Sequence, residues 1–293
     1  MSMDEFIESL KEDRKVRGTK SFLRRVIASW YYQIKIYVSY KMNLALEIID
    51  IVLSALIYYY IGFLVSPEDL IKLGYSPDYI AFALSGIALS RYIWTSVARL
   101  AHKMRHEISG GTFESLATVD FDNFKSWLTG QVLYGFTWSS SVFIGTLLVG
   151  YLLGAKFSRN PLIWLQAVLI VILIVAVHSA IGVMAAGMYI THKQLETLLV
   201  LMTAVIEFFG GVIYPLALLW NYPILYYIAL LIPFTHGLEL FRRTIMDETW
   251  ITDPKMLYHL GVLVAFLPLI YLSFKVYEHY LTVAKKKGLL SAY

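Results

Sequence analysis

The chain contains no cysteine among its 293 residues. Disulfide bonds, thiolate nucleophiles and cysteine-ligated zinc or iron–sulfur sites are therefore excluded. Charge is also scarce, because only 16% of the residues are charged, whereas 58% are hydrophobic and the mean hydropathy is +0.62. Ordinary soluble domains carry about 25% charged residues. The composition therefore indicates an integral membrane protein.

Two sequence signals are also missing. No phosphate-binding G-x-x-x-x-G-K-[ST] motif occurs, so the chain is not expected to hydrolyse ATP or to act as an enzyme by itself, and no cofactor is expected in it. No apolar run precedes Leu44, which follows a long charged leader, so no secretory signal is visible. The first apolar run is therefore expected to remain as a membrane span.

Long apolar runs, in contrast, are abundant. A transmembrane helix needs about 20 apolar residues. Six stretches qualify, at roughly Leu44–Val65, Tyr79–Val97, Trp127–Gly154, Leu162–Ile190, Leu195–Ile213 and Leu257–Phe274. The predicted fold is an all-α membrane protein, with a cytoplasmic leader over residues 1–43 and a six-span domain over residues 44–293.

Basic residues are distributed unevenly among the segments that join these spans. If both termini are cytoplasmic, 18 of the 25 Lys and Arg residues lie on the cytoplasmic side, six lie opposite, and Arg91 lies inside a span. Because basic loops remain in the cytoplasm, this distribution indicates a multi-pass cell-membrane protein with both ends inside. The net charge of +4 then fits contact with anionic membrane lipid, and nucleic-acid binding is not expected.

The leader itself carries a helical pattern. Apolar side chains recur at helical spacing along one face of residues 22–38, while Arg24, Arg25 and Gln33 lie on the other face. This pattern, rich in aromatic residues, predicts an amphipathic helix at the cytoplasmic membrane interface. A helix packed on a soluble partner is the alternative.

The polar segment HEISGGTFESL, residues 106–116, separates the second and third spans. Gly110 and Gly111 permit a sharp break in the backbone, and Thr112 is placed as the N-cap of a new short helix, with Glu114 in its first turn. Phe113 and Leu116, three residues apart, would share a face that a cytosolic protein binds. The alternative is a turn and short helix that only join two spans.

A second segment, residues 207–247, is apolar but interrupted by glycines and prolines. The interrupting residues are Gly210, Gly211, Pro215, Pro223 and Pro233. A straight helix does not accommodate these prolines, so two half-length helices forming a re-entrant hairpin over about residues 214–236 are predicted on the outer side. Broken backbone at membrane depth requires protein or a water-filled cavity around it. The alternative, a full span at Trp220–Leu240, would place Lys285–Lys287 outside.

Together these two segments resemble the permeases of type-2 ATP-binding cassette (ABC) exporters. In that family a Gly-Thr-aromatic/Leu-Glu-x-Leu motif marks a cytoplasmic coupling helix, which corresponds to about residues 107–118 here. The matching residues are Gly111, Thr112, Phe113, Glu114 and Leu116, and Glu107 and Gly110 adjoin them. A late family signature is matched by Gly211, Pro215, Pro223, Pro233, Thr235, Glu239 and Arg242. Family members often carry Thr-Pro shortly after the first motif, whereas this chain reads Thr118-Val119.

The resemblance implies a half-permease that pairs with a second permease copy, identical or related. Separate nucleotide-binding subunits, which carry the ATP and Mg, would dock at the coupling helix. The expected function is export of an amphiphilic or glycan-type substrate. An ion or solute channel is the alternative, and an intramembrane enzyme is a further one.

Charged residues within or beside the spans are further candidates, because burial of charge in hydrocarbon is costly. They are Glu47, Asp50, Arg91, Glu207, Glu239 and Arg242. Such residues either line a transport pathway or form ion pairs, and a structural pair of Arg91 with Glu47 or Asp50 is expected. His178, in the fourth span, is interpreted as a residue that hydrogen-bonds between helices.

Enzymatic chemistry finds little support. His102 and His106 share one helix face as in zinc proteases, but those need Glu directly after the first histidine, and Lys103 stands there. Neighbouring cations would also repel a metal dication, so no metal site is expected. No G-x-S-x-G motif or other nucleophile constellation of a serine hydrolase is visible.

Overall fold

A computed structural model describes residues 19–113, 115, 121–192 and 195–289. These residues are helical or form connecting loops, and no strand occurs among them. Five helices are long and apolar enough to cross a membrane. They are α3 (Lys41–Gly62), α5 (Tyr79–Trp94) continuing through η2 (Thr95–Arg99) and α6 (Leu100–Ser109), α8 (Phe121–Leu152), α9 (Pro161–Thr191), and α13 (Pro254–Ala265) with α14 (Pro268–Lys287). An all-α fold and a multi-pass membrane protein are therefore confirmed.

The remaining predicted span, Leu195–Ile213, corresponds to a shorter helix. α10 (Glu196–Phe209) has 14 residues and ends at Gly210. At 1.5 Å per residue it is about 21 Å long, which is less than the roughly 30 Å of a hydrocarbon core. A sixth candidate arises if the bent pair α11 (Pro223–Leu230) and α12 (Pro233–Asp247) counts as one span.

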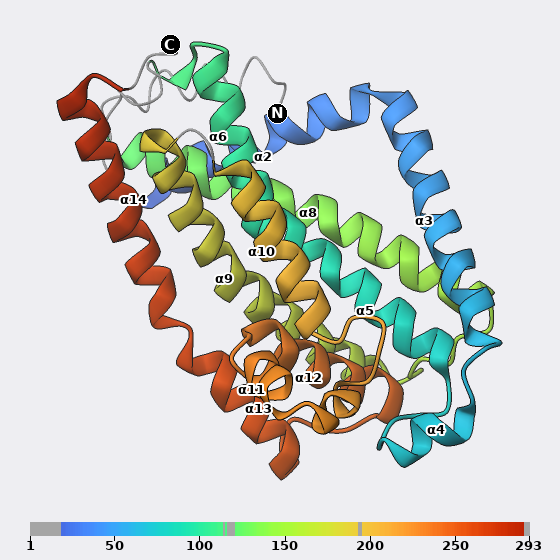
Figure 1. The fold of residues 1–293 in the computed structure, drawn as a ribbon. Coiled ribbons are helices and arrows are strands. Elements are labelled where there is room, and N and C mark those ends of the chain that lie inside the picture. The colour runs from blue at the N-terminus through green and yellow to red at the C-terminus, as the bar shows by residue number, and fades with distance from the viewer. Residues whose placement is uncertain (1–18, 114, 116–120, 193–194, 290–293) are drawn as a thin grey trace.

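α9 lies at the centre of the bundle (Figure 1). Asn160 caps its first turn by accepting a hydrogen bond from the Leu162 amide, and Pro161 occupies the first helical position. Small residues then allow close contacts: a Cβ on Gly187 would lie 2.8 Å from the Tyr277 Cα of α14. Close packing through small residues is the usual way in which membrane helices associate.

α2 (Thr19–Ser39) packs along α8. Trp30 Nε1 donates to Thr137 Oγ1 over 2.9 Å, and Ser29 Oγ donates to the Trp127 carbonyl over 3.3 Å. The opposite edge leaves apolar side chains such as Leu23 and Ile27 exposed. The predicted apolar stripe is thus divided, because one edge contacts α8 and the other is exposed.

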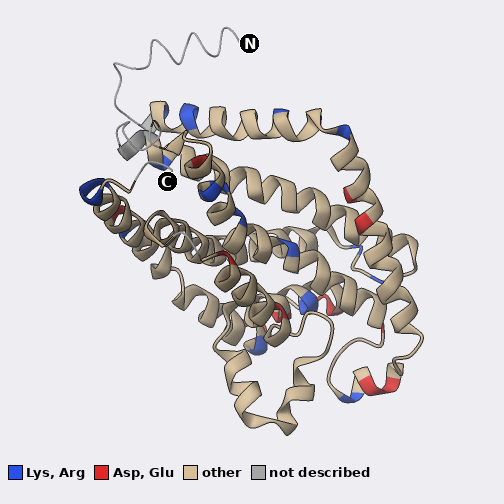
Figure 2. Cartoon of the chain, turned by 45° about the horizontal axis from the view of Figure 1, so that its top comes forward, with Lys and Arg blue, Asp and Glu red and all other residues tan. Residues whose placement is uncertain are grey.

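α3 stands apart from the rest of the bundle along most of its length (Figure 1), and only Ile51 and Ala55 are buried on it. α4 (Pro67–Lys72) follows it and leads into α5. The start of α2, the end of α6 and the end of α14 lie at one end of the bundle, and α4, α11 and α13 lie at the other (Figure 1). Figure 2 shows many basic residues along α2, α6 and the end of α14.

Candidate functional site

The turn after α6 is defined by two backbone hydrogen bonds. The Gly111 amide donates to the Ile108 carbonyl over 3.2 Å, and the Thr112 amide donates to the Glu107 carbonyl over 3.0 Å. Gly111 has a φ of 71°, in the left-handed region that glycine adopts without strain. This pattern is a Schellman motif, so the predicted backbone break is present and reverses the chain at one end of the bundle.

Thr112 precedes helical residues 113 and 115, as expected of an N-cap, but its hydroxyl bonds backwards to Glu107. Glu107 also pairs with Lys103, with 2.8 Å between Nζ and Oε1. The turn is thereby fixed to the last helical turn of α6, while Gly110, Gly111 and Thr112 remain exposed.

Phe113 does not occupy the exposed face that the sequence predicts. Its side chain is 0% exposed and packs edge-on against Phe124 of α8, with ring centroids 6.2 Å apart. Phe124 in turn stacks on Tyr277 of α14 at 5.2 Å. The prediction of exposure was wrong because these two aromatic partners come from distant parts of the sequence. Glu114 and Leu116 lie outside the described residues.

The predicted ion pair of Arg91 is present. Arg91 Nη2 lies 2.9 Å from Asp50 Oδ2, which joins α5 to α3, and the Asp50 side chain is 59% exposed. Glu207 of α10 lies within electrostatic range of Arg91. Glu47 instead accepts a hydrogen bond from the Tyr37 hydroxyl. Residues Asp50, Arg91 and Glu207 form the charged face of α3, α5 and α10.

The segment after α10 contains broken helices. η3 (Leu216–Asn221) follows Pro215, α11 begins at Pro223, and α12 begins at Pro233. α11 and α12 meet at 83°, a bend that fits either a re-entrant hairpin or one broken span, so the prediction of a hairpin and the alternative of a full span over Trp220–Leu240 both stay open. α10 ends at Gly210, where a Cβ added to this glycine would lie 2.6 Å from the Ile206 carbonyl oxygen. The next residue, Gly211, has a φ of 67°.

Arg242 holds this turn through its buried guanidinium group. Nη1 donates to the Gly211 carbonyl over 2.7 Å, Nη2 donates to the Val212 carbonyl, and Nε and Nη2 donate to the Phe82 carbonyl over 3.2 and 3.0 Å. The group also lies over the Phe82 ring at 3.5 Å. Arg242 therefore fixes the turn after α10 to α5.

Glu239 pairs with Arg243 rather than with Arg242, at 2.6 Å between Oε1 and Nη2. Its other oxygen accepts a hydrogen bond from the Tyr75 hydroxyl over 3.1 Å. Burial and the Glu239 charge raise the pKa of Tyr75 well above its ordinary value, so the phenol stays protonated and donates. The Tyr75–Glu239–Arg243 group thus ties the loop before α5 to α12.

The histidines also differ from expectation. His178 Nδ1 lies 2.7 Å from the Ile174 carbonyl oxygen of the same helix, α9. This hydrogen bond lies within one helix, whereas the sequence predicts a bond between two helices. His102 lies 3.1 Å from Glu196, which also contacts Arg105 and thereby joins α6 to α10. Among the described residues, no group of three or more His, Cys, Asp or Glu side chains is arranged to hold a metal ion.

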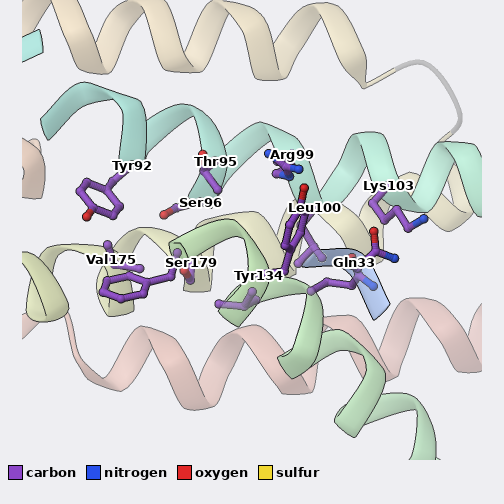
Figure 3. A pocket seen from close by; sticks show the side chains of 13 residues that line it. Gln33, Tyr92, Thr95, Ser96, Arg99, Leu100, Lys103, Tyr134, Val175 and Ser179 are labelled. Atoms are coloured by element: carbon purple, nitrogen blue, oxygen red, sulfur yellow. The ribbon is translucent and has the colours of Figure 1, made fainter. Parts of the chain in front are cut away.

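Sequence reasoning missed a polar cavity beside η2. The cavity measures about 60 Å³, and Figure 3 shows its lining side chains, with Gln33 and Lys103 at one end and Tyr92 and Ser179 at the other. η2 is a π-helical turn, and such turns often occur at functional sites. A Cβ on Gly182 would lie 1.8 Å from the Ser96 carbonyl oxygen. The absence of a side chain at Gly182 therefore allows α9 to approach η2.

No family model matches the chain, and no curated protein matches it.

Proposed function

We propose that this chain is the transmembrane permease subunit of an ATP-driven exporter with type-2 ABC architecture. It would act as a pair of permease copies driven by separate nucleotide-binding subunits that supply ATP and Mg. The substrate would be amphiphilic or glycan-like and would move from the cytoplasm or inner leaflet outward. The end of the bundle that holds α2, the end of α6 and the end of α14 would face the cytoplasm.

The observation that carries the proposal is the aromatic connection from the exposed turn to two long helices. Phe113 anchors the turn to Phe124 of α8, and Phe124 contacts Tyr277 of α14. The Tyr277 hydroxyl also lies 3.8 Å from the Met104 sulfur of α6. A force applied by an ATPase to the exposed residues Gly110–Thr112 would therefore reach α6, α8 and α14 through packed side chains.

The charged face of α3, α5 and α10 supports a pathway or a contact between permease copies. Asp50 is more than half exposed on an apolar helix. An ionisable group at membrane depth is unfavourable when it faces hydrocarbon. In the proposed pair, this face meets either the second copy or a water-filled route for the substrate.

The broken helices at the opposite end support an outer gate. Residues 210–232 contain two short helices joined by turns, and Arg242 satisfies the turn carbonyls from within the protein. Such backbone is tolerated at membrane depth only where protein or water surrounds it. A channel would also fit this feature, but it would not require the anchored turn at the other end.

Copurification tests the proposal. The full-length tagged chain, purified from its native membranes, should bring down an ATPase that carries the G-x-x-x-x-G-K-[ST] motif. Phe113→Ala should reduce the recovered ATPase several-fold, because the turn loses its buried anchor, while Phe113→Leu should retain most of it. Leu218→Ala, an exposed position at the outer end, is the matched control. Recovery of no such ATPase with the unmodified chain would refute the proposal and favour a channel.

A further inference from the structure

The polar cavity beside η2 contains a cation without a carboxylate partner. Arg99 lies over two aromatic rings, 4.6 Å from the centroid of Tyr134 and 4.8 Å from that of Trp138. Among the ion pairs of the described residues, none joins Arg99 to an acid. Lys103, in the same cavity, is neutralised by Glu107. The cavity therefore keeps one positive charge that an anion would complement.

The other groups that line the cavity are suited to an oxygen-rich ligand. Gln33, Thr95, Ser96, Gln131 and Ser179, whose side chains carry hydroxyl or amide groups, are among the residues that line it. The volume of about 60 Å³ corresponds to roughly four to six water-sized centres, because one water needs about 10–15 Å³ by this measure. That is the size of one phosphate group. The charge of Glu47 acts on Tyr134, and Glu47 accepts a hydrogen bond from the Tyr37 hydroxyl.

An apolar groove begins where this cavity ends. The groove measures about 420 Å³ and lies between α8, α9 and α14. Leu133, Ile172 and Ile270 are among its apolar lining residues. The cavity and the groove share four residues, namely Val132, Phe136, Val175 and Ser179. A charged site and an apolar site are thus adjacent across the gap between α8 and α9.

We infer that this composite site binds an anionic membrane lipid, with the phosphate at Arg99 and one acyl chain in the groove. Charge complementarity selects an anionic head group, and the lining of the groove selects a hydrocarbon chain. Basic pockets between membrane helices are known to bind anionic lipid head groups. The inference does not rest on the proposed function, because neither the cavity nor the groove is lined by a residue of the charged face.

Binding is tested with the full-length chain in neutral detergent. The probe is lysophosphatidic acid with an oleoyl chain, and native mass spectrometry measures its dissociation constant. Monooleoylglycerol has the same chain without phosphate, and inorganic phosphate has the anion without the chain. We expect each of these two to bind at least ten-fold more weakly, because each fills only one part of the site.

Variants then separate the two parts of the site. Arg99→Gln should weaken binding of lysophosphatidic acid at least ten-fold, and Arg99→Lys should restore much of it. Ala176→Trp, which fills the groove, should weaken binding similarly without altering the charge. Arg105→Gln is the control. It removes an exposed cation of α6 and should change binding of lysophosphatidic acid less than two-fold.

Equal binding of the lipid to Arg99→Gln and to the unmodified chain would overturn the inference. Equal affinity for monooleoylglycerol would do so as well, since the charge would then play no part. If Arg99→Gln does not fold, Ala176→Trp and the two partial ligands still decide the question, and undiminished binding to Ala176→Trp would contradict the groove assignment.

Discussion

Replacing Arg242 by methionine should release the turn that follows α10. The guanidinium group is almost fully buried and is the donor to the Gly211 and Val212 carbonyls. The third acceptor, the Phe82 carbonyl, lies within α5 and has its own helical partner. Methionine preserves most of the side-chain volume but donates no hydrogen bond, so two buried carbonyl groups of the turn lose their donor.

The loss of folding stability in Arg242→Met follows from those two carbonyl groups. An unsatisfied buried polar group costs about 1–3 kcal/mol, so Arg242→Met should destabilise the fold by about 2–6 kcal/mol. At about 2–4 °C for each kcal/mol, the unfolding midpoint should fall by roughly 10 °C. Thermal unfolding in detergent, followed by tryptophan fluorescence, measures this change.

A second assay reports on the turn itself. Because the chain has no cysteine, Val212→Cys introduces a single thiol at a position that is 7% exposed. This thiol should react slowly with maleimide in the otherwise unmodified chain and many times faster with Arg242→Met added. Arg159→Met is the matched control, because it makes the same substitution at an exposed arginine. If Arg242→Met unfolds at the same temperature as Arg159→Met and leaves the thiol equally protected, the structural role given to Arg242 is wrong.

Two further substitutions test the packing and the charged face. Gly182→Ala places a Cβ 1.8 Å from the Ser96 carbonyl oxygen and should destabilise the chain by about 1–3 kcal/mol in thermal unfolding; Gly261→Ala, with no atom within 4 Å, is the control and should not. Asp50→Asn removes the ion pair with Arg91. In the water-filled route proposed for this face the pair is solvated, so its loss should change stability by less than about 1 kcal/mol. A loss as large as that of Arg242→Met would show instead that the pair is a structural lock.

The positions of the spans could be predicted because hydropathy and capping residues act locally. The predicted fourth span, Leu162–Ile190, differs from α9 by one residue at each end, since Asn160 and Pro161 fix its start. Pro223 and Pro233 likewise mark the starts of α11 and α12. α10 ends before the predicted limit because Gly210 and Gly211 end the helix there.

Tertiary contacts decided the features that the sequence did not reveal. Phe113 is buried by rings from α8 and α14, which no local pattern indicates. η2 contains neither proline nor glycine, and the residue that accommodates it, Gly182, belongs to α9. Tyr134 and Trp138 are one helical turn apart, and this spacing was the sequence signal for the Arg99 site. The spacing does not specify which cation lies over the two rings.

The proposed function depends on where an ATPase contacts the chain. Ser115 is exposed beside the anchored turn, and Trp220 is exposed in η3. Ser115→Cys and Trp220→Cys, each the only thiol of its chain, are to be cross-linked in native membranes with a short thiol-to-amine reagent. Mass spectrometry then identifies the attached protein. We expect a protein with the G-x-x-x-x-G-K-[ST] motif to be attached at residue 115 and not at residue 220. Attachment of that protein at residue 220, or its absence at residue 115, would contradict the proposed function.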